Sequence, residues 1–230
     1  LLEPKKFLII EQICALLQQK DSGKKSLKKT KKFIYLISPN KILLKNFYKV
    51  LEDLFKTQKI YFFQLRLKKE KKNKIIKIAK KVRKITKKYN VKLIINDDPH
   101  LANKIDADGC HIGQKDFDIK KARKILNNKI LGVTCHNSER LVREAIKNGA
   151  DYIALGSFFH SKTKKVKFFA DFQTLKRVKE FSKIDVVAIG GINHLNYKKV
   201  LLNKANFLAI SSYIWKNKIL SPEKALEKLK

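Results

Sequence analysis

Residues 94–116 read Ile-Ile-Asn-Asp-Asp-Pro-His-Leu-Ala-Asn-Lys-Ile-Asp-Ala-Asp-Gly-Cys-His-Ile-Gly-Gln-Lys-Asp, and this stretch is the clearest guide to the fold. The apolar residues before Asn96 predict a buried strand. Pro99 predicts the start of a short helix, because the first turn of a helix tolerates a residue without an N–H. Residues 107–112 predict a second strand. If the two strands are parallel neighbours, Asp97 and Asp116 both lie at their carboxyl ends.

Two carboxylates at the ends of neighbouring strands suit a hard cation. Mg²⁺ is bound by one or two carboxylates, keeps several waters and contacts substrate phosphates. Asp97 and Asp116 are therefore candidate Mg²⁺ ligands. The alternative is that Asn-Asp and Gln-Lys-Asp are turn residues that cap helices. Spacing alone leaves both interpretations open.

Outward from this stretch, short apolar segments alternate with longer amphipathic ones. The predicted strands are 33–38, 60–66, 91–96, 109–112, 130–134, 152–156, 186–190 and 207–211. The predicted helices lie near 41–56, 71–89, 99–105, 118–127, 138–148, 171–182, 194–203 and 221–229. Alternating βα units imply a parallel sheet, and eight units close into a (β/α)8 TIM barrel. An open doubly wound sheet is disfavoured, since no Gly-x-Gly-x-x-Gly follows the first strand.

The barrel is expected to span residues 33–230, with a separate N-terminal piece before it. Residues 1–19 predict an extra amphipathic helix, and residues 20–32 are a polar basic linker. A helix docked on the fold or on a partner is the first interpretation, and a helix on a membrane surface the second. No apolar run reaches the roughly 18 residues of a membrane span, and no signal-peptide cleavage pattern is visible.

The composition is strongly basic, with a formal net charge of +34 at pH 7. This charge raises a nucleic-acid-binding protein as an alternative. The excess is nearly all Lys and is spread over every predicted helix, whereas Arg leads in phosphate and base recognition. No specific nucleic-acid partner is therefore expected. The three cysteines have no metal-ligand spacing and predict free thiols in a reducing cytoplasm. The sequence is compatible both with a monomer and with a homo-oligomer.

In a barrel, function is expected at the carboxyl ends of the strands. Polar residues follow the predicted strands at those ends, and they are Gln64, Arg66, Lys68, Asn96, Asp97, Gln114, Asp116, Thr134, His136, 156–164, 190–193, Ser211 and Ser212. Gly190 and Gly191 allow a ligand to approach the backbone closely. Arg66 offers a fork for a phosphate and Lys68 a point charge. Together with Mg²⁺, this set predicts one diphosphate and one monophosphate substrate.

The histidines give a weaker signal. His111 lies inside a predicted strand, where filling of the barrel and chemistry are equally supported. His136 follows a strand and is a candidate ligand contact or acid–base group. No Ser-His-Asp or Cys-His arrangement is visible, so charge and metal rather than a nucleophile are expected to carry the reaction.

The order and spacing of seven motifs resemble the thiamine phosphate synthase family, over about residues 33–215 of the chain. The motifs are Phe-Gln-Leu-Arg-Leu-Lys (63–68), Ile-Asn-Asp (95–97), Asp-Gly-Cys-His-Ile-Gly-Gln-Lys-Asp (108–116), Gly-Val-Thr-Cys-His (132–136), Asp-Tyr-Ile-Ala-Leu-Gly-Ser-Phe-Phe (151–159), Ser-Lys-Thr-Lys (161–164) and Ala-Ile-Gly-Gly-Ile (188–192). The resemblance implies a transferase that joins 4-amino-2-methyl-5-hydroxymethylpyrimidine diphosphate to a thiazole monophosphate. Diphosphate would depart, and the thiazole nitrogen would capture the pyrimidine-methyl cation.

The resemblance also implies roles for individual residues. Those that match contacts to the pyrimidine diphosphate are Gln64, Arg66, Lys68, Asn96 and Lys164. Asp97 and Asp116 match the Mg²⁺ ligands. The thiazole phosphate site is matched by Ser161, Lys162, Thr163, Gly191, Ile210 and Ser211. Thr134 stands where the family commonly has Ser and keeps the hydroxyl. Arg66, Lys68, Thr134 and Lys164 are the implied catalytic residues.

Two departures from the family pattern stand out. The loop at 161–164 opens with Ser and carries Lys162, where the family usually has Thr and a small residue or Pro. The first 32 residues lie outside the match. A thiazole tautomerase with the same barrel is the nearest alternative. It would use a His at a position like His136 and would not need a diphosphate–metal site.

Overall fold

The computed structural model describes residues 32–43, 45–160 and 168–229. Its strands are β1 Ile34–Ile37, β2 Ile60–Leu65, β3 Lys92–Asn96, β4 Gly109–Ile112, β5 Ile130–His136, β6 Tyr152–Gly156, β7 Asp185–Ile189 and β8 Phe207–Ile210. Its helices are α2 Phe47–Lys56, α3 Lys72–Lys88, α4 Pro99–Lys104, α5 Ile119–Leu126, α6 Glu139–Lys147, α7 Phe172–Phe181, α8 Tyr197–Leu202, α9 Ser212–Trp215 and α10 Pro222–Glu227. The predicted helix 1–19, nearly all of the linker 20–32 and residues 161–164 lie outside the described residues.

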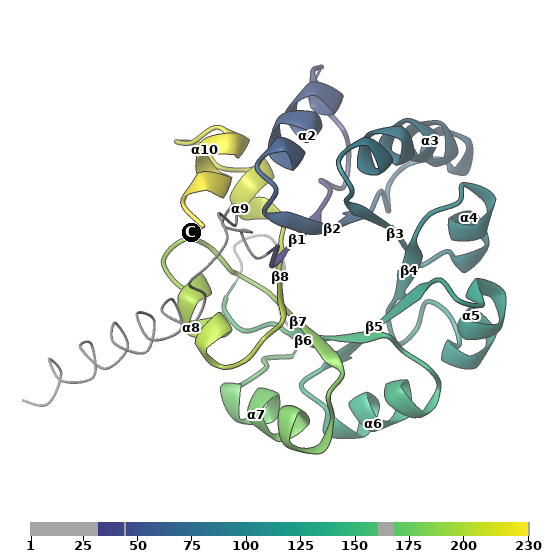
Figure 1. Ribbon diagram of the computed structural model, residues 1–230, viewed down its shortest axis with the longest axis vertical. Coiled ribbons are helices and arrows are strands. Elements are labelled where there is room, and N and C mark those ends of the chain that lie inside the picture. Colours follow the sequence, from purple (N-terminus) through teal and green to yellow (C-terminus); the bar gives the residue numbers. More distant parts are fainter. Residues whose placement is uncertain (1–31, 44, 161–167, 230) are drawn as a thin grey trace, which may run out of the picture. The chain divides into compact units, whose positions relative to one another are not determined.

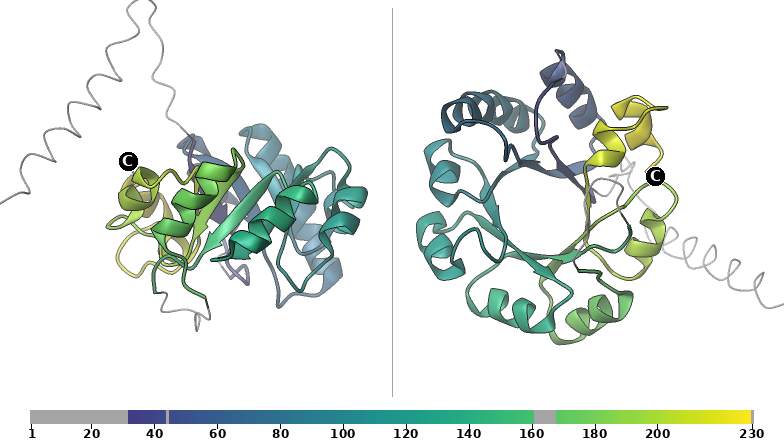
Figure 2. Two further views of the ribbon diagram at one scale, coloured as in Figure 1. Left: turned by 90° about the horizontal axis from the view of Figure 1, so that it is seen from below. Right: turned by 180° about the vertical axis from the view of Figure 1, so that it is seen from behind.

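The eight strands form one closed parallel barrel in chain order. Closure comes from pairing of β1 with β8, with Tyr35 opposite Ala209 and Leu36 opposite Ile210. Figure 1 looks down the barrel and shows the helices as a ring around the strands, and Figure 2 shows the same ring from the side and from behind. The predicted (β/α)8 barrel is therefore confirmed, and the open doubly wound sheet is excluded.

The core has two layers because side chains alternate across each strand. Ile34 and Leu36 of β1 face outward and pack with the helices in the larger apolar cluster. Tyr35 and Ile37 face inward, and they join a second cluster that fills the barrel itself. The inner cluster contains large aromatic side chains, so the barrel is a packed core rather than a pore.

Side-chain caps fix the start of several helices at the carboxyl end of the barrel. Asp98 accepts from the N–H of Leu101 at the start of α4, and Asp118 accepts from the N–H of Lys121 at the start of α5. A cap of this kind satisfies a backbone donor that the helix leaves unpaired. Helix capping therefore applies to Asp98, within the 94–116 stretch, and to Asp118, two residues after it. It does not apply to Asp97 or Asp116.

The differences from the predictions include two element boundaries and one additional helix. Strand β5 runs on to His136 rather than ending at Thr134, because a shift of register between these residues lets the strand continue against β6. Helix α2 begins at Phe47, since Leu43 before it is exposed and has no buried helical face to join. The short helix α9 was not predicted, because its four residues are too few to show helical periodicity.

The amino-terminal end of the barrel repeats one arrangement three times. The residue just before β4, β6 and β8 is Asp108, Asp151 and Asn206. Each side chain accepts from the backbone N–H of the second residue of the preceding strand, at 2.8, 2.7 and 2.9 Å, and from a cation of the helix that precedes that strand. The N–H donors are Leu93, Leu131 and Val186, and the cations are Arg83, Arg123 and Lys179. The repeat links α3, α5 and α7 to the strands at the amino-terminal end of the barrel.

None of the described helices is both long and apolar enough to cross a lipid bilayer.

Candidate active site

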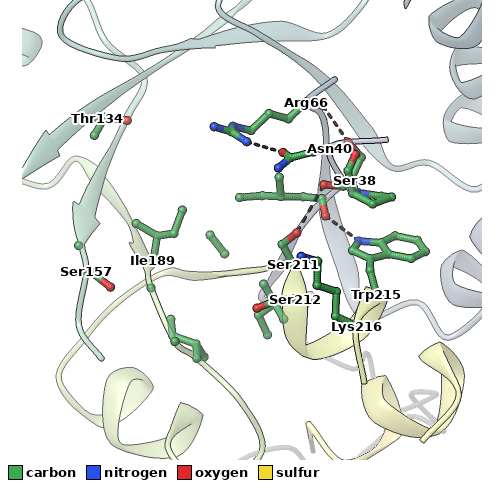
Figure 3. A pocket seen from close by; sticks show the side chains of 18 of the residues that line it. Ser38, Asn40, Arg66, Thr134, Ser157, Ile189, Ser211, Ser212, Trp215 and Lys216 are labelled. Carbon is green, nitrogen blue, oxygen red and sulfur yellow. Dashed lines mark hydrogen bonds between the residues drawn. The ribbon is translucent and has the colours of Figure 1, made fainter. Parts of the chain in front are cut away.

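A pocket opens at the carboxyl ends of the strands. Its volume is about 500 Å³, within the range of small-molecule sites. The lining comes from β1, β2 and β5–β8 with their loops, and it includes Arg66, Thr134, Gly191, Ile210 and Ser211. In Figure 3, Thr134 and Ser157 lie across the pocket from Ser211 and Trp215. Five of the predicted substrate-binding residues are thus brought together around one cavity.

Arg66 is held in place from the loop after β1. Its Nη1 donates to Asn40 Oδ1 at 2.7 Å, and its backbone N–H donates to Ser38 Oγ at 2.9 Å (Figure 3). Burial lowers the pKa of the guanidinium, and the charges of Asp97 and Asp116 oppose this effect. A guanidinium stays charged under these conditions. The side chain is therefore an oriented cation at the pocket wall with donors left for a ligand.

The two predicted metal-ligating carboxylates share one cation. Lys68 Nζ lies 2.8 Å from Asp97 Oδ2 and 3.6 Å from Asp116 Oδ1. Burial raises the pKa of Asp97, the Lys68 ammonium opposes the rise, and the neighbouring Asp116 adds to it. Asp97 has a left-handed backbone, with φ of 65°. Asp116 Oδ2 accepts from the N–H of Gly113 at 3.1 Å, so that turn helps to orient the carboxylate.

Mg²⁺ fits this donor set. No group of three or more His, Cys, Asp or Glu side chains is placed to hold a metal among residues 32–43, 45–160 and 168–229. Mg²⁺ does not require such a group, because it uses one or two carboxylates and completes its shell with waters and substrate phosphates. Asp97 and Asp116 both contact the same ammonium, and this places two hard oxygen donors around one point of positive charge. Neither carboxylate nor Lys68 is among the described residues that line the pocket, so the cluster stands beside it.

The far side of the pocket is built from backbone and hydroxyl groups. Gly190 and Gly191 after β7 have φ of 104° and 64°, which a residue with a Cβ adopts only with strain. A Cβ on Gly190 would overlap Ser157, and one on Gly191 would crowd the backbone of His160. Ser211 follows β8 at the start of α9, and its Oγ lies 3.4 Å from the carbonyl oxygen of Ser38. The end of β7 thus exposes main-chain groups to the pocket, and Ser211 adds a hydroxyl at the end of β8.

The remaining predicted residues are placed as follows. Gln64 is buried on β2 and faces into the barrel, and Asn96 is half-buried at the end of β3. Thr134 lines the pocket and bonds to His111 at 2.8 Å. Ser161, Lys162, Thr163 and Lys164 lie outside the described residues, so their predicted roles stay predictions.

Sequence reasoning did not single out Ser38, Asn40 and Trp215, which line the pocket. Ser38 and Asn40 support Arg66, and Trp215 Nε1 donates to the carbonyl oxygen of Ile37 at 2.7 Å. The polar residues at the end of the first strand were visible in the sequence, but only the fold shows that they contact Arg66.

His136 lies in the pocket lining with φ of 54° and packs against Phe168, with ring centroids 4.4 Å apart. Burial lowers its pKa. The predicted ligand-contact position of His136 is compatible with this placement.

The comparisons with known proteins agree with the geometry. Residues 34–214 match the family model described as thiamine monophosphate synthase. The chain is 60% identical to the thiamine-phosphate synthase of Pelagibacter ubique over 201 residues, which covers 87% of this chain and 97% of the relative. It is 42% identical to the corresponding synthase of Clostridioides difficile over 205 residues, covering 87% of this chain and 95% of the relative.

A solved structure gives the same result. Thiamine phosphate pyrophosphorylase from Pyrococcus furiosus superimposes with a TM-score of 0.75 at 28% identity, and the match covers 87% of this chain and 95% of that one. The sequence relatives, the family model and the solved structure therefore all indicate the same family. The chain belongs to the thiamine monophosphate synthase family and is a transferase of thiamine biosynthesis.

Proposed function

We propose that this chain condenses 4-amino-2-methyl-5-hydroxymethylpyrimidine diphosphate with thiazole phosphate to give thiamine phosphate and diphosphate. One observation carries the proposal beyond the family assignment. The pocket has Arg66 in its lining with the Lys68–Asp97–Asp116 cluster beside it, and the ends of β7 and β8 add glycine backbone and the Ser211 hydroxyl to the same lining. These two sets of groups can hold two different phosphorylated groups in one pocket.

Arg66, Lys68, Asn96 and Lys164 are the proposed contacts of the diphosphate, together with Mg²⁺ held by Asp97 and Asp116. When bound, the metal supplies positive charge that stabilises the diphosphate as it leaves. Arg66 is already oriented by Asn40, so its guanidinium needs little reorganisation to meet that charge. Lys68 reaches the same region from the loop after β2 and already contacts both carboxylates.

The proposed reaction breaks one bond and forms another. The bond between the pyrimidine methylene carbon and the diphosphate oxygen breaks, and its electron pair leaves with diphosphate. The lone pair of the thiazole nitrogen then forms the new carbon–nitrogen bond. Arg66, Lys68 and Lys164 stabilise the departing charge, and Thr134 contacts the pyrimidine from the opposite wall. Apolar groups such as Ile189 and Ile210 line the pocket and limit the access of water to the cation.

The thiazole phosphate is proposed to lie against Gly191, Ile210 and Ser211, and Ser161, Lys162 and Thr163 are further proposed contacts. The left-handed backbone at Gly191 exposes main-chain groups, and Ser211 adds a hydroxyl at the same wall. Backbone N–H groups after the seventh and eighth strands of such barrels frequently hold phosphate. Ile210 is buried, so its proposed contribution is its main chain.

The two alternatives are not favoured. A tautomerase would use His136, which does line the pocket, but it would leave the Asp97–Asp116–Lys68 cluster without a purpose. The synthase relatives match over nearly their whole length at up to 60% identity. A nucleic-acid-binding barrel would not need rim carboxylates, since they repel phosphate in the absence of a metal.

The cellular setting is inferred from chemistry. Cys110 and Cys135 are buried free thiols, and burial raises the pKa of Cys135 to about 12. Thiols of this kind fit a reducing cytoplasm, where we place the enzyme with its small phosphorylated substrates. Homo-oligomerisation is compatible with this function and is left to measurement.

The decisive experiment is a coupling assay with both phosphorylated halves and Mg²⁺, with thiamine phosphate and diphosphate read by mass spectrometry. Wild type should form both products in equal amounts, and EDTA should abolish them. Asp97→Asn and Lys164→Ala should lose at least about 100-fold in kcat/KM. Asp53→Asn is the matched control, because within the described part of the chain Asp53 forms ion pairs only with Lys49 and Lys56 on α2, and the variant should keep full activity. Absence of product from folded wild type would refute the proposal, and thiazole tautomerisation with His136→Ala would be tested next.

A further inference from the structure

Five polar side chains from five different strands meet inside the barrel, below the pocket. They are Tyr35 on β1, Gln64 on β2, His111 on β4, Thr134 on β5 and Tyr152 on β6. Tyr35, Gln64 and Tyr152 are at most 3% exposed and His111 is 9% exposed. Buried polar groups are costly unless they are hydrogen-bonded. Their arrangement therefore needs an explanation that apolar filling does not give.

The five groups form one unbroken hydrogen-bonded chain. Gln64 Nε2 donates to the Tyr35 hydroxyl at 3.1 Å, and that hydroxyl lies 2.7 Å from the hydroxyl of Tyr152. The Tyr152 hydroxyl lies 3.0 Å from His111 Nδ1. His111 Nε2 lies 2.8 Å from Thr134 Oγ1. All four separations are ordinary hydrogen-bond distances.

The amide at one end gives the chain a direction. Because Gln64 Nε2 can only donate, the Tyr35 oxygen accepts from it, and the arrangement in which the buried Tyr35 proton also has an acceptor directs that proton to Tyr152. The Tyr152 proton then goes to His111 Nδ1, so the neutral imidazole carries its proton on Nε2. That proton is donated to the Thr134 oxygen, which leaves the Thr134 hydroxyl proton free to point into the pocket. Reversing the Gln64 amide would reverse every step.

Packing and burial hold this arrangement. A Cβ on Gly132 would overlap the Tyr152 ring, so the absence of a side chain there makes room for the tyrosine. The rings of His111 and Tyr152 stack with centroids 5.6 Å apart and an angle of 20°. Burial lowers the pKa of His111 to about 4, with Asp116 opposing and Arg66 and Lys68 adding to the effect. A neutral imidazole with one donor and one acceptor is what the chain requires.

Both ends of the chain meet the substrate region. Thr134 lines the pocket itself. Gln64 lies two residues before Arg66 on the same side of β2, so it lies directly beneath a pocket residue. With Nε2 engaged by Tyr35, Gln64 Oε1 is the group left to accept from a ligand. The two ends therefore offer an acceptor on one side and a hydroxyl donor on the other.

We propose that Tyr35, Tyr152 and His111 are positioning residues that fix the polarity of Gln64 and Thr134, and thereby select an aminopyrimidine over its oxo analogue. The amino group at C4 donates toward the Gln64 oxygen, and the ring nitrogen across the ring from it accepts from Thr134. In a 4-oxo analogue the exocyclic donor becomes an acceptor and meets the Gln64 oxygen unfavourably. This selectivity rests on the proposed function, whereas the hydrogen-bonded chain does not.

The chain is tested first without substrate, on the full-length protein. Long-range ¹H–¹⁵N NMR at pH 7 should show His111 as a neutral imidazole protonated at Nε2. Tyr152→Phe removes the donor to Nδ1, so the His111 nitrogen shifts should change clearly. An imidazole protonated at Nδ1, or an imidazolium, in wild type would overturn the proposal whether or not the protein is active.

Selectivity is tested by kinetics with the 4-amino and 4-oxo pyrimidine diphosphates. Tyr35→Phe and Tyr152→Phe should each lower the ratio of the two kcat/KM values at least about 10-fold, since one directed hydrogen bond is lost. Tyr61→Phe is the matched control, because Tyr61 is 36% exposed and makes ring contacts with Phe62 and Phe207 outside the chain. It should leave the ratio unchanged. An unchanged ratio in folded Tyr152→Phe would overturn the proposal, whereas absence of product from wild type would refute only the proposed function.

Discussion

At the amino-terminal end of the barrel, Arg123 is fully engaged by the protein, whereas at the carboxyl end Arg66 is only partly engaged. Arg123 donates to the carbonyl oxygens of Asn127, Lys129 and Gly149 and to Asp151. Arg66 has one side-chain partner, Asn40, among the described residues. Arg123 thus stabilises contacts between elements at the amino-terminal end, whereas Arg66 keeps donors for a ligand beside the pocket at the carboxyl end.

The carboxylates differ in the same way. Asp108 accepts from a strand N–H and from Arg83, so each partner satisfies the other within the fold. Asp97 and Asp116 share one lysine at the rim, and burial keeps the pKa of Asp97 raised. A raised pKa means that the charged form is held at a cost in this site. The charged groups at the amino-terminal end of the barrel are thus used for contacts within the fold, whereas those at the carboxyl end are placed to bind a ligand.

The largest effect is expected for Arg66→Ala. Loss of an oriented guanidinium should lower kcat/KM by about 10²–10³, equivalent to about 3–4 kcal/mol of transition-state stabilisation. The melting temperature should stay nearly constant, because Arg66 bonds to few protein groups. Arg123→Ala is the opposite case and should lower stability while leaving the kcat/KM of the folded protein unchanged. Steady-state kinetics and thermal unfolding of both variants check this pair, and a large loss of activity in folded Arg123→Ala would break the contrast.

A smaller effect is expected for Asp108→Ala at the amino-terminal end of the barrel. The change leaves the N–H of Leu93 and Nη1 of Arg83 without their acceptor, at a cost of about 2–3 kcal/mol. Asp108→Asn should recover most of this loss, since Asn206 fills the equivalent place before β8. Urea unfolding of both variants measures the free energies. Equal destabilisation by Asp108→Ala and Asp108→Asn would show that the charge of Asp108, rather than its acceptor oxygen, stabilises the contacts with Leu93 and Arg83.

The smallest effect is expected at Asp171, which lies at the carboxyl end of the barrel but acts as a helix cap. Its carboxylate accepts from the N–H of Thr174 at 2.6 Å, and Asp171→Ala should cost about 1 kcal/mol. The hydrogen bond from Thr174 lowers the pKa of Asp171. The cap is therefore fully present above pH 3.8 and is lost as the pH falls through the lower folded pKa. The stability difference between wild type and Asp171→Ala should be constant from pH 5 to 8 and shrink near pH 3.

Asp171→Asn is the control for that measurement. It keeps an acceptor oxygen without a titrating group, so its stability relative to Asp171→Ala should not change over the same pH range. Both variants should keep wild-type kcat/KM, because Asp171 is not among the described pocket residues. A loss of activity in Asp171→Asn would mean that the rim carries function beyond the pocket and the Lys68 cluster.

The sequence predicted the barrel because each strand is an apolar run between amphipathic helices, and these local patterns survive folding. The sequence was a weaker guide to which residues in the turns cap the helices. Asp98 and Asp118, rather than Asp97 and Asp116, cap helices, since a cap depends on one residue's backbone angles. The continuation of β5 to His136 depends on a shift of register against β6, which no local pattern encodes.

The sequence by itself determined the eight βα units, the polar rim and the pairing of carboxylates with cations there, because strand ends are marked by local composition. Only the tertiary structure decided which polar residues touch. Pairing of β1 with β2 places Asn40 against Arg66, and the closed barrel links Gln64 to Thr134 through Tyr35, Tyr152 and His111. The two contacts of Tyr152 in this chain join strands that are not neighbours in the barrel, and both depend on the inward direction of a side chain. Contacts of that kind follow from the geometry of the closed sheet and not from any short stretch of sequence.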